Sequence, residues 1–453
     1  MEKVEKVENA LIEGVIWKQL LIFFFPILYG ALFQQLYNMT DAIIVGNFAG
    51  KEALASIGGT TATLINLLIG FFSGLSAGAS VVISHYYGAG DKEQVSKSVH
   101  TAIALGLACG GLLTIIGLFG APIILKIMNV PDEIMKHSLV YTKIYFIGII
   151  PICIYNISTG ILRAIGDSKR PLRLLLMTFI MNIVLDILFV AVFKWGVTGV
   201  AIATILSQTT GAILTSLILI KTEASYRLMI KNIHFSKKIL THMIKIGIPA
   251  GIQSAFYSFS NLVIQSRINQ FGTDVIVATT IFEKMEGLFW TIMSVSGVAI
   301  TTFVGQNFGA KKYDRIHKSM KITLFVGIGI AIIFSLILSI FGRFIFRVFT
   351  DDMIAIQKGM DILYITVPFY FFFVFIEVLS GVLRGTGNSV VPSVITGIGV
   401  CLLRVIWLMI VMPFAKDIRT IMIAYPMSWV VAAIMIVIYY KKSGWIKRCM
   451  PIA

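Results

Sequence analysis

Long stretches without charged residues recur along the whole chain and restrict its fold more than any other feature. Of 453 residues, 57% are hydrophobic and only 13% are Asp, Glu, Lys or Arg, about half the charged share of a typical soluble domain. A membrane-spanning helix needs about 20 consecutive apolar residues, and stretches of that length follow one another with short polar breaks. The sequence therefore predicts an all-α polytopic membrane protein.

The apolar runs and the polar breaks between them predict about twelve spans in two sets of six. The first set is expected near residues 17–48, 53–84, 96–125, 138–163, 171–193 and 196–220. The second set is expected near residues 240–270, 275–306, 318–346, 357–384, 391–413 and 418–440. These sets define an N-lobe at 17–220 and a C-lobe at 240–440, with an amino-terminal segment at 1–16, an interlobe linker at 221–239 and a basic tail at 441–453.

Positive charge concentrates in alternate loops and predicts the orientation of the chain. The net charge is +16, but the Lys and Arg residues lie in short loops and form no single basic face, so nucleic acid is not an expected partner. Cytoplasmic loops carry an excess of Lys and Arg, as the linker at 221–239 does here. We therefore expect a monomeric, multi-pass protein of the cell membrane, in contact with lipid, with both termini in the cytoplasm.

The two halves of the chain repeat one another at an offset of 221 residues. Ile161–Leu172 falls on Val382–Ser393, and both segments carry a Leu-Arg-x-x-Gly motif. The same offset sets Tyr86–Ala89 on Asn307–Ala310. Because each half has six spans, the halves share one orientation, and a pseudo-two-fold axis along the membrane normal is expected to relate them.

An ionisable side chain inside a span is costly and marks a functional site by default, and the clearest carboxylates of this kind are Asp41, Asp186, Glu286 and Glu377. Asp41, Asp186 and Thr204 are expected at one depth, and Asn182 lies one helical turn before Asp186. Such oxygens suit a hard cation such as Na⁺, and a buried carboxylate can instead carry a proton. The alternative is that Asn182 and Asp186 only join helices through hydrogen bonds.

A second group of charges lies in the C-lobe. Glu377 precedes Arg384 by seven residues, and the repeat pairs Glu377 with Asn156 in the N-lobe. Since buried charges need partners, we expect Glu286 and Arg404 to pair with Glu377. This charge network would line a substrate cavity or take part in coupling, or it would only hold helices together.

Several motifs together resemble the MATE (multidrug and toxic compound extrusion) family, over essentially the whole chain. They are Asp41 with Val45-Gly46, the duplicated Leu-Arg-x-x-Gly motif, Gly305–Ala310, Asn182–Asp186, and Trp195–Gly199 leading into Ala203-Thr204. The segment Glu377–Gly381 is similar to the MepA and DinF side of the family. NorM-like members carry an acid in the seventh span, and Phe256–Ser258 has none.

The resemblance implies a V-shaped pair of six-helix bundles that exports cationic amphipathic drugs in exchange for H⁺ or Na⁺. Carried over by position, it implies a coupling site at Asp41, Asn182, Asp186 and Thr204, with Asn156 as a neighbour. We expect no cofactor besides the coupling ion and no enzyme activity, because no GxxxxGK[ST] phosphate-binding loop and no catalytic metal spacing occur. The alternative cargo is a lipid-linked oligosaccharide, carried by a flippase of the same superfamily.

Overall fold

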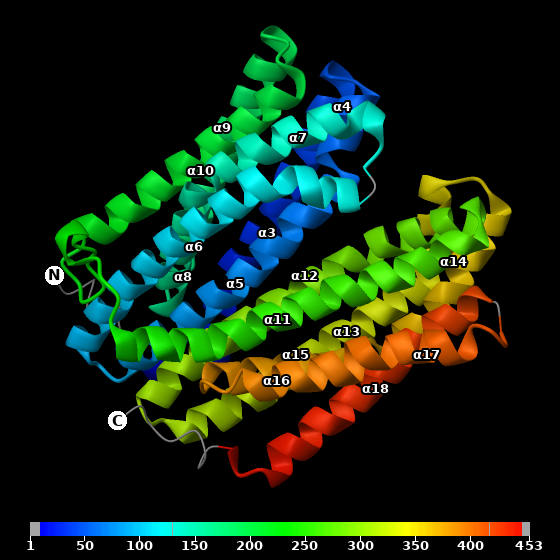
Figure 1. Cartoon of the computed structure of the whole chain (residues 1–453). Helices are drawn as coiled ribbons and strands as arrows, with labels where there is room; N and C mark the ends of the chain where they lie inside the picture. Colours follow the sequence, from blue (N-terminus) through cyan, green and yellow to red (C-terminus); the bar gives the residue numbers. More distant parts are fainter. Residues whose placement is uncertain (1–9, 129, 416, 446–453) are drawn as a thin grey trace. The chain divides into compact units, whose positions relative to one another are not determined.

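The computed structural model describes residues 10–445 except 129 and 416. Residues 1–9 of the predicted amino-terminal segment and 446–453 of the predicted basic tail lie outside this range. Within it, the chain forms helices joined by short connections (Figure 1). The prediction of an all-α membrane protein is confirmed.

The first half of the described chain contains nine α-helices, one π-helix and one 3₁₀-helix. In order they are α2 (Ala10–Glu13), α3 (Ile16–Phe48), α4 (Lys51–Ile57), α5 (Gly59–Gly88), α6 (Lys92–Ile127), α7 (Asp132–Ile147), α8 (Ile149–Ala164), α9 (Lys169–Asp186), the π-helix η1 (Ile187–Val192), α10 (Gly196–Lys221) and the 3₁₀-helix η2 (Ile230–Asn232).

The second half follows the same plan. In order it contains α11 (Lys237–Ile268), the 3₁₀-helix η3 (Asn269–Phe271), α12 (Thr273–Gly309), α13 (Tyr313–Phe349), α14 (Met353–Thr366), the 3₁₀-helix η4 (Val367–Phe369), α15 (Tyr370–Gly385), α16 (Val390–Thr396), the π-helix η5 (Gly397–Leu402), α17 (Leu403–Val411) and α18 (Ile418–Lys442).

The predicted spans correspond closely to these helices. By length and composition, ten helices of the described chain can cross a membrane, or eleven when α7 and α8, which meet at 52°, count as one bent span. Helix α11 has 32 residues and is long enough to cross as well. The helices that meet both criteria account for at most eleven of the twelve spans that the sequence predicts, and α11, in the remaining one, is not among the helices of the described chain that meet them.

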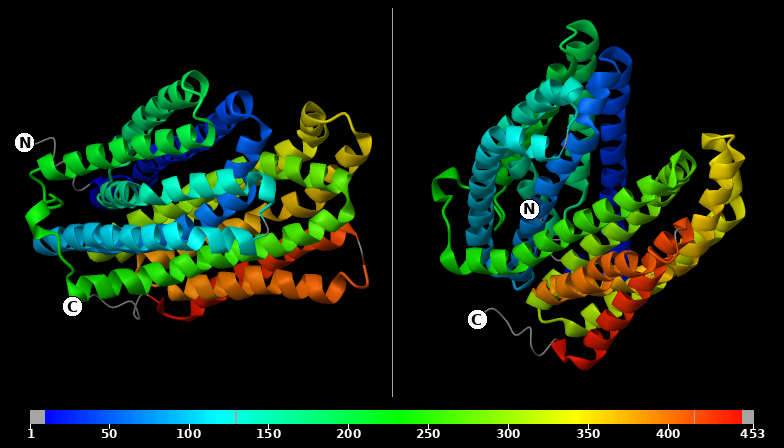
Figure 2. Two further views of the ribbon diagram at one scale, coloured as in Figure 1. Left: turned by 45° about the horizontal axis from the view of Figure 1, so that its top comes forward. Right: turned by 45° about the vertical axis from the view of Figure 1, so that its right-hand side comes forward.

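The chain packs into two compact units. Within the described residues, the amino-terminal unit comprises residues 10–14 and 21–251, and the carboxy-terminal unit comprises residues 15–20 and 252–445. In each unit taken alone, the helices lie side by side along a common direction (Figures 1 and 2). The division between the units falls inside α11, whereas the sequence predicts a linker at 221–239.

Closely packed glycines hold the first half of α11 in the amino-terminal unit. A Cβ atom added to Gly74 of α5 would lie 2.2 Å from the backbone nitrogen of Gly251, and one added to Gly78 would lie 2.7 Å from that of Gly247. Only glycine permits backbones to approach so closely, and such contacts are a common way to join helices in membranes. The first half of α11 is therefore fixed to α5 through its backbone.

The internal repeat reappears as matching backbone turns. Gly166 and Gly387, which the 221-residue offset aligns, have φ angles of 92° and 90°, in the left-handed region that glycine favours. In both turns the next residue, Asp167 or Asn388, donates its backbone N–H to the carbonyl five residues earlier at 2.9 Å. The duplicated Leu-Arg-x-x-Gly motif therefore builds the same helix end twice.

Several prolines lie within the predicted spans, and only some of them lie at or near a break in a helix. Pro368 lies in η4, which separates α14 from α15, and the bend between α7 and α8 is at Gly148, close to Pro151. Pro26, Pro249 and Pro426 lie inside continuous helices. A proline in a span therefore marks a break in some of these helices and is accommodated in others.

Candidate functional site

Three helices of the amino-terminal unit, α3, α9 and α10, carry the predicted coupling residues. Helix α9 ends at Asp186, one turn after Asn182, so both side chains project from one face. Helix α3 carries Asp41, and Tyr37 lies one turn before it on the same face. Thr204 lies on α10, which packs against α9.

Most side chains of this group are withdrawn from the protein surface, whereas Asp41 is half-buried. Asn182 and Asp186 have no exposed surface, and Tyr37 and Thr204 are 3% and 7% exposed. Seven of their oxygen and nitrogen atoms are buried without a hydrogen-bond partner: Tyr37 Oη, Asp41 Oδ1, Asn182 Oδ1 and Nδ2, Asp186 Oδ1 and Oδ2, and Thr204 Oγ1. Buried polar atoms of this kind cost free energy unless another group satisfies them.

The two carboxylates share one electrostatic environment. Asp41 and Asp186 interact with one another, and Tyr37 and Tyr141 lie within electrostatic range of both. Among the described residues, no Lys, Arg or His side chain forms an ion pair with either carboxylate. Two buried acids without a basic partner are a costly arrangement unless a cation or a proton neutralises them.

The donor set fits a hard monovalent cation or a proton. Two carboxylates, an amide oxygen and hydroxyl oxygens are the ligands that hard cations prefer. The buried oxygens of Asp41, Asn182, Asp186 and Thr204 that lack a hydrogen-bond partner are free to provide such ligands. A proton shared by the two carboxylates would remove part of the same charge.

The structure does not place Asn156 in this group of unsatisfied atoms. Its Nδ2 donates a hydrogen bond of 2.8 Å to the carbonyl of Ile152, one turn earlier in α8. Because the amide is satisfied inside its own helix, no observed contact supports the predicted role as a neighbour of the coupling site.

Tyr37 and Tyr141 belong to the environment of the carboxylates, and the sequence analysis missed both. For Tyr37 the sequence carried a signal, since it lies four residues before Asp41 and shares its helix face. Tyr141 comes from α7, and nothing in the sequence indicates that α7 approaches α3. Both tyrosines offer a hydroxyl that can donate to a carboxylate or accept from a bound ligand.

Two predicted site residues of the carboxy-terminal unit, Glu377 and Glu286, have partners within the protein itself. Arg384 donates to Glu377 Oε1 at 3.0 Å, and this ion pair is largely buried. The hydroxyl of Tyr370 donates to Glu286 at 2.9 Å. Both partners, Arg384 and Tyr370, lie on α15. Glu377 lies on the same helix.

Arg404 is buried among aromatic rings. Its Nε donates to Ser428 Oγ at 2.9 Å, and its guanidinium lies 4.2 Å from the ring centre of Tyr425 and 5.9 Å from that of Trp429. The prediction that Glu286 and Arg404 pair with Glu377 is wrong. The reason is local, because each of these residues finds a nearer partner.

Because Gly297 of α12 has no side chain, it leaves room for the Glu377 carboxylate. A Cβ atom added to Gly297 would lie 2.0 Å from Glu377 Oε1, a distance that real contacts do not allow. Only the bare backbone of a glycine therefore lets this carboxylate lie against α12 while it binds Arg384.

We predict that Gly297→Ala and Glu377→Gln destabilise the protein by similar amounts, about 1–2 kcal/mol, because each removes the same partly buried ion pair. The effects should not add in the double variant, since both changes act on one contact. The measurement is thermal unfolding in detergent. Gly287→Ala in the same helix is the matched control, because nothing lies within 4 Å of a Cβ there; additive effects would contradict the prediction.

Comparison with known proteins agrees with this architecture. The family model MatE matches residues 26–188 and again residues 249–410. The two matches begin 223 residues apart, close to the offset of the internal repeat. The family model therefore recognises each half of the chain separately.

Several relatives match over nearly their full length. The chain is 26% identical to the probable multidrug resistance protein YpnP of Bacillus subtilis over 435 residues, which is 96% of each chain. It is 24% identical to the probable multidrug resistance protein YoeA of the same organism, with 94% of each chain covered. The probable multidrug resistance protein NorM of Thermotoga maritima is 26% identical over 84% of this chain and 83% of that protein.

Solved structures share the fold. A crystal structure of MATE in the bent conformation has a TM-score of 0.91 at 22% identity, and the match covers 98% of this chain and 99% of that one. A MOP superfamily transporter from Pyrococcus furiosus has a TM-score of 0.89 at 22% identity, with 98% of each chain covered. With a family model matched over both halves, the chain belongs to the MATE (MatE) family of membrane transporters.

Proposed function

We propose that this protein is a cation-coupled antiporter that exports cationic amphipathic organic compounds by alternating access. The coupling ion, H⁺ or Na⁺, would bind at Asp41, Asn182, Asp186 and Thr204. The protein would lie in the cell membrane with both termini in the cytoplasm, act as a monomer in contact with lipid, and use no cofactor besides the ion. It would have no enzyme activity.

The contrast between the two units is the observation that carries this proposal. In the amino-terminal unit, Asp41 and Asp186 have no basic partner among the described residues. In the carboxy-terminal unit, Arg384 pairs with Glu377, and Arg404 lies within electrostatic range of Glu286. The carboxylates of the amino-terminal unit therefore need a cation from outside the protein to balance their charge. The carboxy-terminal unit contains its own positive charges, Arg384 and Arg404.

The names of relatives support the cargo class. YpnP, YoeA and NorM are each named as probable multidrug resistance proteins, and multidrug export requires a carrier that accepts varied organic compounds. For this chain we expect amphipathic cations, because the carboxylates Asp41, Asp186, Glu286 and Glu377 lie in its membrane helices.

The mechanism follows from the cost of buried charge. In the proposed cycle, cargo binds from the cytoplasmic side, and an external cation then neutralises the Asp41 and Asp186 carboxylates. Neutral side chains can repack among apolar helices at lower cost than charged ones, so ion binding would shift the transporter to a state with low cargo affinity. One elementary charge moving through 100 mV supplies about 2.3 kcal/mol to this exchange.

The proposal can be tested with purified protein in liposomes. Efflux of a fluorescent lipophilic cation would be recorded under an imposed H⁺ gradient, an imposed Na⁺ gradient, or neither. We expect one of the two gradients to drive efflux against the concentration of the compound. Equal efflux under all three conditions would overturn antiport, and movement of labelled lipid in place of the drug would favour a flippase.

A further inference from the structure

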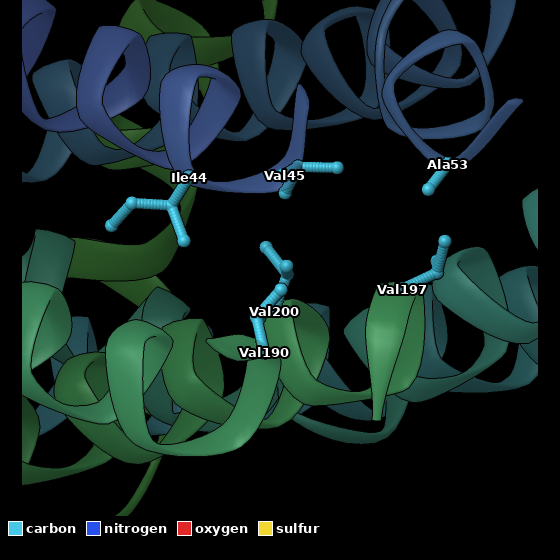
Figure 3. Close-up of a cluster of buried hydrophobic side chains, with 6 residues drawn as sticks. All are labelled: Ile44, Val45, Ala53, Val190, Val197 and Val200. Atoms are coloured by element: carbon cyan, nitrogen blue, oxygen red, sulfur yellow. The ribbon is translucent and has the colours of Figure 1, made fainter. Parts of the chain in front are cut away.

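A cluster of buried aliphatic side chains lies next to the coupling site along the same helices of the amino-terminal unit. Figure 3 shows its six members pointing toward one another: Ile44, Val45, Ala53, Val190, Val197 and Val200. They come from α3, α4, η1 and α10. Three of these elements are the site helix α3, the direct continuation of the site helix α9, and the site helix α10.

Three valines of the cluster each lie four residues from a residue of the coupling site. Val45 follows Asp41 by four residues, Val190 follows Asp186 by four, and Val200 precedes Thr204 by four. At about 1.5 Å per residue of α-helix, Val45 and Val200 each lie about 6 Å from their site residues along the helix axis, and Val190 lies in the π-helix η1, four residues after Asp186.

All three valines are displaced toward the same end of the unit. This is the end where α3 and η1 finish and α10 begins, because Val45 is near the end of α3 and Val197 is in the first turn of α10. In the orientation proposed above, it is the extracellular end. An ion that enters along the axis of this bundle from outside meets the valines before it meets the carboxylates.

The cluster is closed to water. Val45 has no exposed surface, and Val190 and Val200 are each 1% exposed. The side chains of the cluster contain no polar atom that could hold a water molecule or replace the hydration shell of an ion. Hydrophobic constrictions of this kind gate ion passage by excluding water.

We propose that the aliphatic cluster is the extracellular ion gate of this transporter. In this role its three valines keep the external solution from Asp186 and Thr204, which are buried, until the cluster separates, and they thereby limit the rate of ion entry. The inference rests on the proposed function, because it assumes that the acidic site binds an ion from outside.

Helix η1 is the element of the gate best suited to move. It is a π-helix that begins directly after Asp186 and contains Val190. Short π-helical segments have wider turns than α-helices and are frequent at functional sites. Movement of η1 would withdraw Val190 from the cluster while α9 stays in place and keeps Asp186 in the site.

The experiment measures access to the site directly. Thr204→Cys is introduced into a chain without the four native cysteines, in right-side-out vesicles. The rate of reaction with a membrane-impermeant cationic thiol reagent is then compared with and without the changes Val45→Thr, Val190→Thr and Val200→Thr. Threonine keeps the shape of valine, and other threonines of this chain, such as Thr215, donate to the carbonyl four residues earlier, so the new hydroxyls have acceptors.

We expect the three changes to raise the labelling rate about tenfold, equivalent to a barrier lower by roughly 1.4 kcal/mol. The control carries Val82→Thr, Val95→Thr and Val99→Thr, which are equally buried in the same unit but outside the cluster, and should label at the original rate. If the triple gate variant does not fold, Val200→Thr alone should show a smaller increase, and Ala53→Val should slow labelling.

Two results would contradict the proposal that the cluster is an ion gate. Unchanged labelling in the folded gate variant means that the cluster only packs the helices. Rapid labelling with the cluster intact means that the site is reached by another route. Failure of the proposed function gives a different result, since efflux would then be equal with and without an imposed ion gradient, whatever the labelling rates are.

Discussion

Asp41→Asn is expected to reduce gradient-driven efflux by about 100-fold, which corresponds to roughly 2.8 kcal/mol of lost ion binding. Asparagine has nearly the shape of aspartate, but it cannot carry the negative charge or accept a proton at neutral pH. Asp186 alone would then have to hold the ion, without the second carboxylate that interacts with it. The measurement is ion-driven efflux of a lipophilic cation from liposomes, with the amount of folded protein matched.

Asp361→Asn is the matched control for this variant. Asp361 is also an aspartate of a membrane helix, but it pairs with the exposed Arg419 at 3.0 Å in the other unit. Exposed ion pairs contribute little to stability, so efflux should stay near the original rate. If Asp41→Asn retains undiminished ion-driven efflux, Asp41 has no part in coupling.

Arg404→Met is expected to produce the largest loss of stability, about 3 kcal/mol. The change removes a buried cation that donates to Ser428 and lies over the ring of Tyr425, and it removes a positive charge that lies within electrostatic range of Glu286. Removing one member of a buried charged set typically costs 3–5 kcal/mol. Thermal unfolding in detergent, followed by tryptophan fluorescence, measures the change.

A second substitution tests whether electrostatics is the cause. If Glu286 is left uncompensated in the variant, then Glu286→Gln should recover part of the lost stability in the double variant. Arg419→Met, at an exposed ion pair, is the control and should unfold close to the original temperature. If Arg404→Met unfolds at the same temperature as this control, the charge of Arg404 does not contribute to the stability of the carboxy-terminal unit.

The sequence predicted the membrane helices well because the hydrophobic effect determines them directly. The predicted spans 17–48 and 196–220 became α3 (Ile16–Phe48) and α10 (Gly196–Lys221). The repeat was also predictable, since identical backbone turns need the same residues, as at Gly166 and Gly387. Helix ends differed by a few residues because helices continue beyond the apolar stretch.

The breaks within spans were harder to predict. The bend at Gly148 and the π-helix η1 depend on how neighbouring helices pack, and no local residue pattern specifies them. Proline was an incomplete guide, since Pro26 and Pro249 lie inside continuous helices.

The candidate site was predictable only in part. Asp41 and Asp186 were found because charge in an apolar span is conspicuous, and Asn182 follows from helical spacing. The partners in the carboxy-terminal unit were not predictable, because they depend on contacts between helices. Arg404 binds Ser428 and lies against aromatic rings instead of pairing with Glu377, a choice that sequence distance does not reveal.

The central claim is that the ion and the cargo compete through Asp41 and Asp186, and one binding measurement tests it most directly. The affinity of purified protein for a lipophilic cation is measured at increasing H⁺ or Na⁺ concentration. Because linkage between two ligands is reciprocal, we predict that the affinity of the unmodified protein falls as the coupling ion increases, and that it becomes independent of the ion when Asp41→Asn and Asp186→Asn are combined. An unchanged ion dependence in that folded double variant would contradict the account.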